Sequence, residues 1–146
     1  MSLTQIFHEA PMKAPPSTIY AALTDPKLLA RWWIPDTRGE SRIGENLEFH
    51  IGDFCQQMKV LALEQDRLVR WTATDQEPAD WSKTEIEFEI RPDGEKCWVR
   101  FRHIGLQADM KRLPYYSLSW AVFLLSLKEL VETGTGLPFP NRWIEQ

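Results

Sequence analysis

The stretch that decides the fold is LPYYSLSWAVFLLSLKELVE, residues 113–132. Its large apolar residues recur at intervals of three and four, a spacing that fits one face of an α-helix and fits no strand. The residues on this stripe are Tyr116, Trp120, Phe123, Leu127, Leu130 and Val131. Pro114 lies near the start, where its missing N–H does no harm, and Gly134 supplies a stop. The pattern predicts one long helix whose aromatic face packs against another layer.

A strand and two short helices are predicted at the beginning of the chain. Residues 4–13 alternate loosely and end at prolines, which is typical of an edge strand. Pro15 and Pro16 open a first short helix. A second, residues 27–32, begins after Asp25, a good N-cap that is followed by Pro26.

From residue 37 onward, apolar and polar residues alternate with the period of β-strands. Strands are predicted at 47–51, 54–64, 67–74, 83–91 and 97–103, with residues 75–82 as a loop. Glu85, Glu87 and Glu89 lie on one face, opposite Arg100 and Arg102 of the next strand. Such pairs fix the register and keep that face in water. An antiparallel meander with one apolar face is expected.

Together these elements predict an α+β fold, in which a curved antiparallel sheet of about six to seven strands wraps around the long C-terminal helix. Residues 1–146 form a single domain, because no linker, repeat or low-complexity tract interrupts them. The space between the sheet and the last helix is the predicted binding site.

Composition and charge exclude several classes of protein. A net charge of −4 offers no basic surface for nucleic acid. The first residues lack the features of a signal peptide, and the apolar run in 113–132 is too interrupted to span a membrane. Cys55 and Cys97 have no C-x-x-C spacing, which predicts reduced thiols and a cytoplasmic location.

No cofactor or metal ion is predicted. Gly-rich phosphate loops and nucleophile elbows are missing from the sequence. His50 and Asp53 are the nearest approach to a pair of metal ligands, and two such residues do not define a site.

The candidate ligand-binding residues are those expected to face the space under the last helix. They are Trp32, Phe49, Trp71, Phe88, Phe101, His103, Tyr116, Trp120 and Phe123. Two interpretations are open: the rings line a cavity, or they pack as an ordinary core. Such a set of rings is more often a plain core. Large rings fill a concave space only with small residues beside them, however, which keeps the cavity as the alternative. Trp32 and Trp33 are either a gate or a plug under the helix pair, and the two roles could be divided between them.

His103 is the single histidine predicted on the inner face, since His8 and His50 share an outward phase with charged neighbours. As a group that titrates near neutral pH, it is the candidate catalytic acid or base. The alternative is a hydrogen-bonded structural histidine.

Leu118, Val122 and Leu125 are predicted to lie opposite the buried stripe of the last helix, where polar residues would be expected. An exposed apolar strip of this kind often marks an interface. Either it forms a homodimer contact, or the C-terminal tail covers it through Phe139, Trp143 and Ile144.

Three segments resemble the START-like superfamily, also called SRPBCC or birch-pollen-allergen-like. They are APPSTIYAALTDPKLLARWW at 14–33, VLALEQDRLVRW at 60–71 and SWAVFLLSLKELVETGTGLP at 119–138. The chain is most similar to the branch named for homology to the activator of heat-shock protein 90 ATPase. It departs from that branch at Gln65 and Asp66, where a proline is usual. The resemblance implies a helix-grip fold over nearly the whole chain.

The resemblance implies fold more firmly than function, because the superfamily includes lipid carriers, hormone-binding proteins and aromatase/cyclases. The leading hypothesis is non-covalent binding of a small hydrophobic or aromatic ligand. One alternative is a cyclase- or hydrolase-like enzyme that uses His103 as a proton carrier. A further alternative is a co-chaperone. It is disfavoured because eukaryotic activators contact the chaperone through a separate N-terminal domain, whereas this sequence begins with the first strand.

Overall fold

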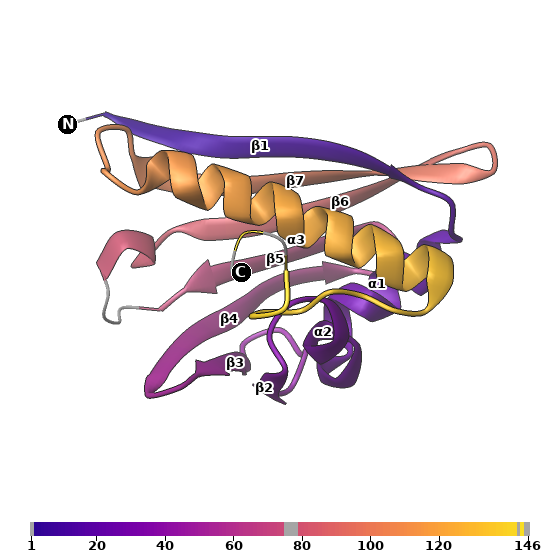
Figure 1. Cartoon of the computed structure of the whole chain (residues 1–146), viewed down its shortest axis with the longest axis horizontal. Helices are drawn as coiled ribbons and strands as arrows, with labels where there is room; N and C mark the ends of the chain where they lie inside the picture. Colours follow the sequence, from indigo (N-terminus) through magenta and orange to yellow (C-terminus); the bar gives the residue numbers. More distant parts are fainter. Residues whose placement is uncertain (1, 75–78, 143, 145–146) are drawn as a thin grey trace.

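The computed structural model of the protein describes residues 2–74, 79–142 and 144. Over these residues, a seven-stranded antiparallel sheet curves around one long helix (Figure 1). The elements are β1 (Leu3–Met12), α1 (Pro16–Thr24), α2 (Pro26–Trp32), β2 (Asp36–Gly39), β3 (Asn46–Ile51), β4 (Phe54–Glu64), β5 (Leu68–Ala73), the 3-10 helix η1 (Ala79–Trp81), β6 (Glu85–Asp93), β7 (Lys96–Gln107) and α3 (Leu113–Thr133). The sheet order is β1-β7-β6-β5-β4-β3-β2. The predicted α+β helix-grip fold is confirmed.

The helix α3 follows the sequence pattern closely. It covers one more residue than the predicted 113–132, and Gly134 ends it in the left-handed conformation with φ 89°. Trp120, Phe123 and Leu127 are buried, as the stripe requires. None of the described helices is long and apolar enough to cross a bilayer. The helix α3 packs against β1 of the sheet and against both short helices.

Strand β2 was not predicted. Its sequence, Asp36–Gly39, contains a single β-branched residue, and it lies at an edge of the sheet, paired with β3 alone. In the predicted loop 75–82, residues 79–81 form η1 and residues 75–78 lie outside the described residues. These departures are local and leave the architecture unchanged.

The prediction that His8 faces solvent is wrong. On β1 the inward phase includes Ile6, His8 and Ala10, and the His8 ring is half-buried. Its Nε2 lies 3.0 Å from the carbonyl oxygen of Ser117 on α3. This contact lies between β1 and α3, which run side by side in Figure 1.

The outer face of the sheet carries the predicted register of glutamates opposite arginines, although the Arg100 guanidinium lies 2.8 Å from the Glu9 carboxylate of β1 instead. Glu87 is opposite Arg102 and Glu89 is opposite Arg100 in the β6–β7 register. Glu87 is nevertheless buried, because the side chains of Arg70 and Arg102 both donate hydrogen bonds to its carboxylate. Burial raises the pKa of Glu87, but the two guanidinium groups outweigh this effect and hold the pKa below its ordinary value.

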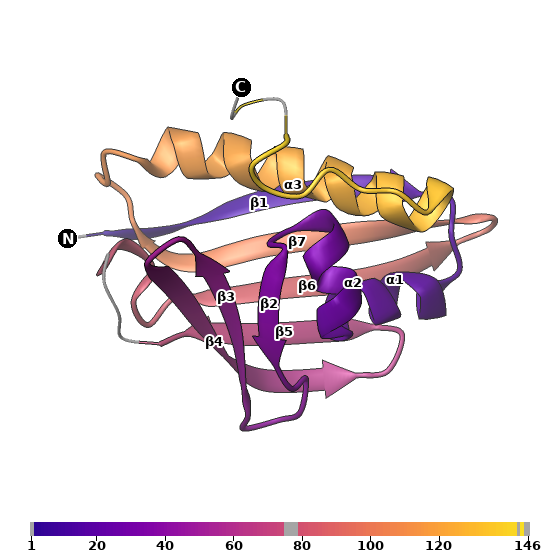
Figure 2. The same cartoon turned by 60° about the horizontal axis from the view of Figure 1, so that its bottom comes forward.

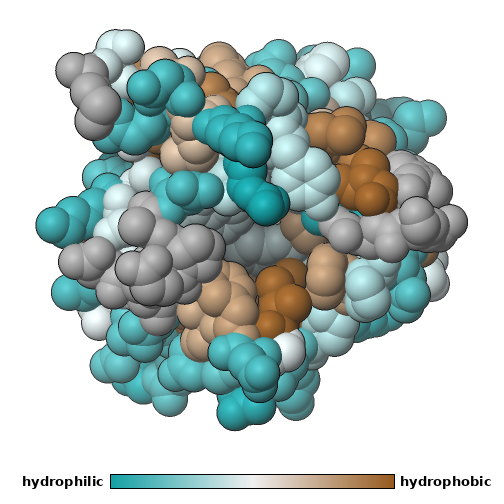
Figure 3. Space-filling view, turned by 60° about the vertical axis from the view of Figure 1, so that its left-hand side comes forward, coloured by the Kyte–Doolittle hydropathy of each residue, from teal (hydrophilic) through white to brown (hydrophobic). Residues whose placement is uncertain are grey.

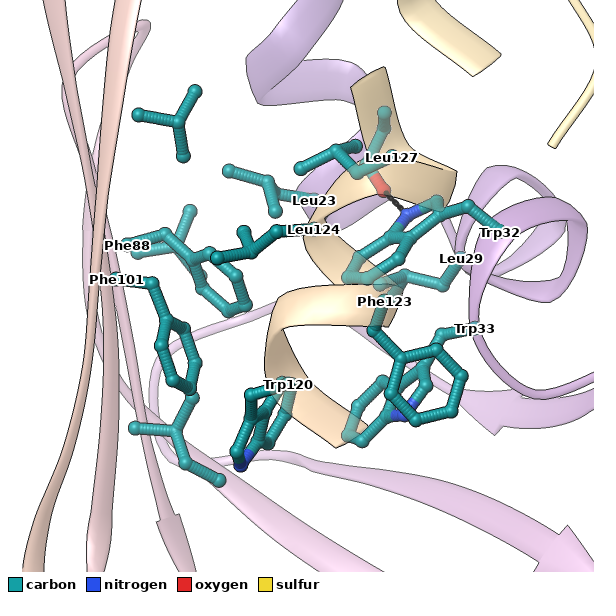
Figure 4. Packing of buried hydrophobic residues seen from close by; sticks show 14 of the residues in the cluster. Leu23, Leu29, Trp32, Trp33, Phe88, Phe101, Trp120, Phe123, Leu124 and Leu127 are labelled. Carbon is teal, nitrogen blue, oxygen red and sulfur yellow. Dashed lines mark hydrogen bonds between the residues drawn. The ribbon is translucent and has the colours of Figure 1, made fainter. Parts of the chain in front are cut away.

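The core is organised around the indole of Trp33, at the end of α2. The centroid of its ring lies 4.3 Å from that of Phe49 on β3, 5.1 Å from Trp120 on α3 and 5.9 Å from Trp71 on β5. Trp32 stacks against Trp33 with 18° between the ring planes, and its Nε1 donates a hydrogen bond of 2.8 Å to the carbonyl of Ala22 (Figure 4). The two tryptophans thus hold the helix pair against both layers.

The chain after α3 runs back along that helix and past α2 (Figure 2). Ser126 on α3 donates to the carbonyl of Trp32 and accepts from the backbone N–H of Leu137, both at 2.8 Å. The N–H of Phe139 donates to the carbonyl of Trp33 at 2.9 Å. A Cβ at Gly136 would lie 2.5 Å from the Arg31 carbonyl oxygen, so this close approach requires glycine. These contacts bring the tail to the same space as Trp33.

Replacing Trp33 with alanine should destabilise the protein by about 3–5 kcal/mol, because the cavity left by a buried indole cannot be closed by four separate elements. Trp98→Ala is the matched control. Trp98 lies on the outer face of β7, where it donates to Asp93 at 3.1 Å, and its loss should cost about 1 kcal/mol or less. Urea unfolding of both variants measures the difference. Equal losses would contradict the central position of Trp33.

Candidate ligand cavity

A cavity of about 310 Å³ lies between the N-terminal half of α3, the β3–β4 hairpin, η1 and the tail. Figure 3 looks at this end of the molecule, where the surface is hollowed at its centre and hydrophobic side chains lie along the rim. The described lining residues are Trp33, Ile34, Phe49, Ile51, Phe54, Gln56, Trp81, Tyr115, Tyr116, Ser119, Phe123, Phe139 and Arg142.

The wall is mainly aromatic. The volume of the cavity is at the lower end of the roughly 300–1,000 Å³ typical of small-molecule sites. An apolar cavity of about 150 Å³ accommodates one benzene ring, so this space corresponds to about two rings. Aromatic walls bind flat apolar molecules by stacked and edge-to-face contacts.

The cavity wall also contains a few polar groups. The hydroxyl of Tyr116 donates to Asp80 at 2.7 Å, and burial together with this carboxylate raises the pKa of Tyr116, which therefore stays protonated. Arg142 donates to the Ser119 hydroxyl at 2.7 Å. The indole N–H of Trp81 is buried and has no acceptor among the described residues. These polar groups lie at separated points among the aromatic lining residues.

Arg142 reaches the cavity, a position that no sequence pattern predicted. The residue is buried, and its guanidinium carbon lies 3.9 Å from the centroid of the Phe123 ring, a cation–π contact. The tail contacts with Trp33 and Ser126 place Arg142 there. It adds the one positive charge among the described lining residues.

The structure separates the predicted ligand-binding residues into two groups. Phe49, Tyr116 and Phe123 lie on the cavity wall. The others lie in the closed core: Trp32, Trp71, Phe88, Phe101, His103 and Trp120. The indole of Trp33 fills the space that they were expected to surround (Figure 4). Of the two adjacent tryptophans, Trp32 is the plug and Trp33 faces the cavity.

The remaining lining residues were not among the predicted ones, for two reasons. Ile51 and Gln56 are in the inward phase of β3 and β4, so alternation alone could have identified them. Trp81 and Phe139 lie in η1 and the tail, and their position depends on tertiary contacts. No periodicity places such residues in advance.

His103 is fully buried, and both its ring nitrogens are occupied. Its Nδ1 accepts from the indole N–H of Trp120 at 3.1 Å, and indole nitrogen can only donate. The proton is therefore on Nε2, which donates to the Thr84 hydroxyl at 2.8 Å. Thr84 donates in turn to the Trp81 carbonyl at 2.6 Å. This geometry favours the structural alternative, in which His103 positions η1 and so the cavity wall.

The apolar strip on α3 is divided by the tail. Leu118 and Leu125 are 51% and 42% exposed, as predicted, but Val122 is only 7% exposed. Val122 lies between Ser119 and Ser126 on the helix, and both serines bond the tail, which covers this part of α3. At Val122 the second alternative therefore applies, because the tail covers this residue. Of the expected tail anchors, Phe139 lies on the cavity wall and Trp143 lies outside the described residues.

This geometry defines the class of protein: a single-sheet helix-grip domain with an aromatic cavity under its long helix. A family model described as activator of Hsp90 ATPase homolog 1-like protein matches residues 13–132. The chain belongs to this family, and the resemblance seen in the sequence is confirmed. No match was found among curated proteins.

Solved structures agree with this assignment. The solution structure of the Aha1 dimer from Colwellia psychrerythraea has a TM-score of 0.85 at 33% identity, over 91% of this chain and 99% of that one. CalU16 from Micromonospora echinospora has a TM-score of 0.73 at 19% identity, covering 88% and 74%. DynU16, from the dynemicin biosynthetic locus, has a TM-score of 0.74 at 17% identity, covering 95% and 49%. The last two likenesses show the fold alone.

The buried His103 should make stability depend on pH. Burial lowers the pKa of His103 from 6.5 to about 3. Between these values the unfolded chain binds the proton and the folded protein does not, so stability falls as pH falls. His103→Gln removes this component and keeps His8 and His50. From about pH 6.5 to about 4.5, wild type should lose about 1–2 kcal/mol more than the variant. Urea unfolding at both pH values measures this, and parallel losses would contradict it.

Proposed function

We propose that this protein binds a small aromatic or hydrophobic molecule of one or two rings in the cavity under α3. The observation that carries the proposal is the cavity itself, about 310 Å³ of space with aromatic residues on its wall. An apolar ligand of that size would gain burial and ring contacts without displacing the core. Trp33, Phe49 and Phe123 belong both to the packed core and to the cavity wall, so a ligand would contact rings that the core already holds in place.

The polar groups on the wall favour a ligand that carries a hydrogen-bond acceptor. The Arg142 guanidinium, which donates to the Ser119 hydroxyl, brings a positive charge and N–H groups to this wall. A phenol, ketone or carboxylate on an aromatic body combines both requirements.

Binding is a better account than catalysis in this cavity. The polar residues among the described lining set are Gln56, Tyr115, Tyr116, Ser119 and Arg142, and none is an ordinary general base near neutral pH. His103 would have to exchange a proton from a closed position with both nitrogens already bonded. Non-covalent binding requires neither a general base nor a proton transfer.

Calorimetric titration with 1-naphthol, indole-3-acetate and naphthalene-2-carboxylate tests the proposal. Ile51→Trp introduces a larger side chain at the cavity wall and should weaken binding by about tenfold or more, equivalent to about 1.4 kcal/mol. Ile43→Trp is the matched control, because Ile43 is 65% exposed and does not line the cavity. Cholesterol, which exceeds the cavity volume, should not bind. The proposal fails if no ring compound saturates wild type, or if both variants bind equally well.

We also propose a homodimer that uses the exposed part of the α3 strip. Tyr115, Leu118 and Leu125 are each more than 40% exposed on this helix, and the Colwellia relative at 33% identity is described as a dimer. Exposed apolar side chains on one helix face often mark an interface.

The oligomeric state of Leu125→Glu in solution tests this interface. A charge placed in a desolvated contact opposes association, so the variant should shift toward monomer in sedimentation or light scattering while wild type is dimeric. Ile43→Glu, which places the same charge at an exposed apolar position away from α3, should leave the dimer intact. A monomeric wild type, or a dimer that tolerates Leu125→Glu, would exclude this interface.

A further inference from the structure

A cluster of metal-ligating side chains lies on the outer face of the sheet, opposite the cavity. On β3, Leu47 and Phe49 point into the core, so Glu48 and His50 point outward. Cys55 on β4 is the register partner of His50. Two strands of one hairpin therefore present a carboxylate, an imidazole and a thiol side by side.

The three ligand atoms converge on one place. His50 Nε2 lies 2.9 Å from Glu48 Oε1 and 3.8 Å from Cys55 Sγ. All three ligand atoms lie within 4.8 Å of one another. Tetrahedral zinc with Zn–S of about 2.3 Å and Zn–N or Zn–O of about 2.1 Å separates neighbouring ligand atoms by about 3.3–3.6 Å. Shifts of a few tenths of an ångström would bring the imidazole to zinc-like separations from both other ligands.

We propose that Glu48, His50 and Cys55 form a binding site for Zn²⁺ or a similar borderline-soft divalent metal ion, with water in the fourth position. Imidazole and thiolate are the ligands that distinguish such ions from Mg²⁺ and Ca²⁺, which prefer oxygen alone. The thiol loses its proton to solvent when the sulfur binds the metal. No redox step is involved.

The surrounding charge suits a divalent cation. On β2, Asp36 is opposite His50 and Arg38 is opposite Glu48. The Arg38 guanidinium is engaged by the Asp36 carboxylate, with Nε 2.8 Å from Oδ1. With Cys55 as thiolate, the Asp36 and Glu48 carboxylates, this thiolate and the Arg38 guanidinium leave a net negative site.

The position of the site indicates a structural role for the metal. Glu48, His50 and Cys55 are each partly exposed, so an ion can enter from solvent. The same hairpin carries Ile51 and Phe54 on its other face, at the cavity wall. A metal ion bridging β3 and β4 would stabilise the hairpin that shapes the cavity. This inference does not depend on the proposed ligand.

Titration of the reduced, metal-free protein with Zn²⁺ in a calorimeter, and with Co²⁺ by absorption spectroscopy, tests the site. Wild type should bind one ion per chain and should show the thiolate-to-cobalt charge-transfer band. Cys55→Ser and His50→Gln should each weaken Zn²⁺ binding by about 10–100-fold and remove or diminish the band.

Matched controls use the other thiol and another histidine. Cys97 is buried on β7, with its sulfur 3.4 Å from the Ala14 carbonyl, and His8 contacts α3. Cys97→Ser and His8→Gln should bind Zn²⁺ as wild type does. Failure of wild type to bind Zn²⁺ at micromolar concentration would overturn the proposal. So would equal affinities in Cys55→Ser and Cys97→Ser, since the cluster would then be a hydrogen-bonded network alone.

Discussion

The Trp33 indole is the contact on which the rest of this structure depends. It packs face to face with Trp71 of the sheet, with 1° between the ring planes, and also contacts Phe49 and Trp120. The backbone of the same residue accepts a hydrogen bond from Phe139 of the tail. One side chain thus joins α2, the sheet and α3, and one carbonyl attaches the tail. Because closely packed interiors transmit small changes, the position of each layer is linked to that of this ring.

The cavity follows from the same arrangement. The rings behind Trp33 close the space under the C-terminal half of α3, and the curvature of the sheet leaves room under its N-terminal half. Trp81 lines that room and is held by the chain of hydrogen bonds through Thr84, His103 and Trp120. A fully packed core and an aromatic cavity therefore coexist, and the two sequence interpretations of the aromatic residues each describe one end of the molecule.

The parts of the fold that follow local rules could be predicted from the sequence. The 3.6-residue period of 113–132, the Asp25 cap and the alternation in β4 and β6 each depend on neighbours along the chain. The candidate site was harder to predict. The helical period shows which way a side chain points, but it does not show which residue that side chain contacts. The helical period correctly predicted that Trp120 faces the sheet. It could not show that the Trp33 indole occupies the space between α3 and the sheet. Arg142 and Trp81 reach the cavity through tertiary contacts that leave no periodic trace.

The most direct test is a ¹H–¹⁵N spectrum of the tryptophan indole groups, recorded during titration with a bicyclic aromatic acid. Each indole N–H gives a separate signal, so the spectrum reports where the ligand binds. The account predicts that the Trp33 and Trp81 signals move and saturate, since both residues line the cavity, and that Trp98 on the outer face of β7 does not respond. Saturable binding that moves Trp98 and leaves Trp33 and Trp81 in place would contradict it.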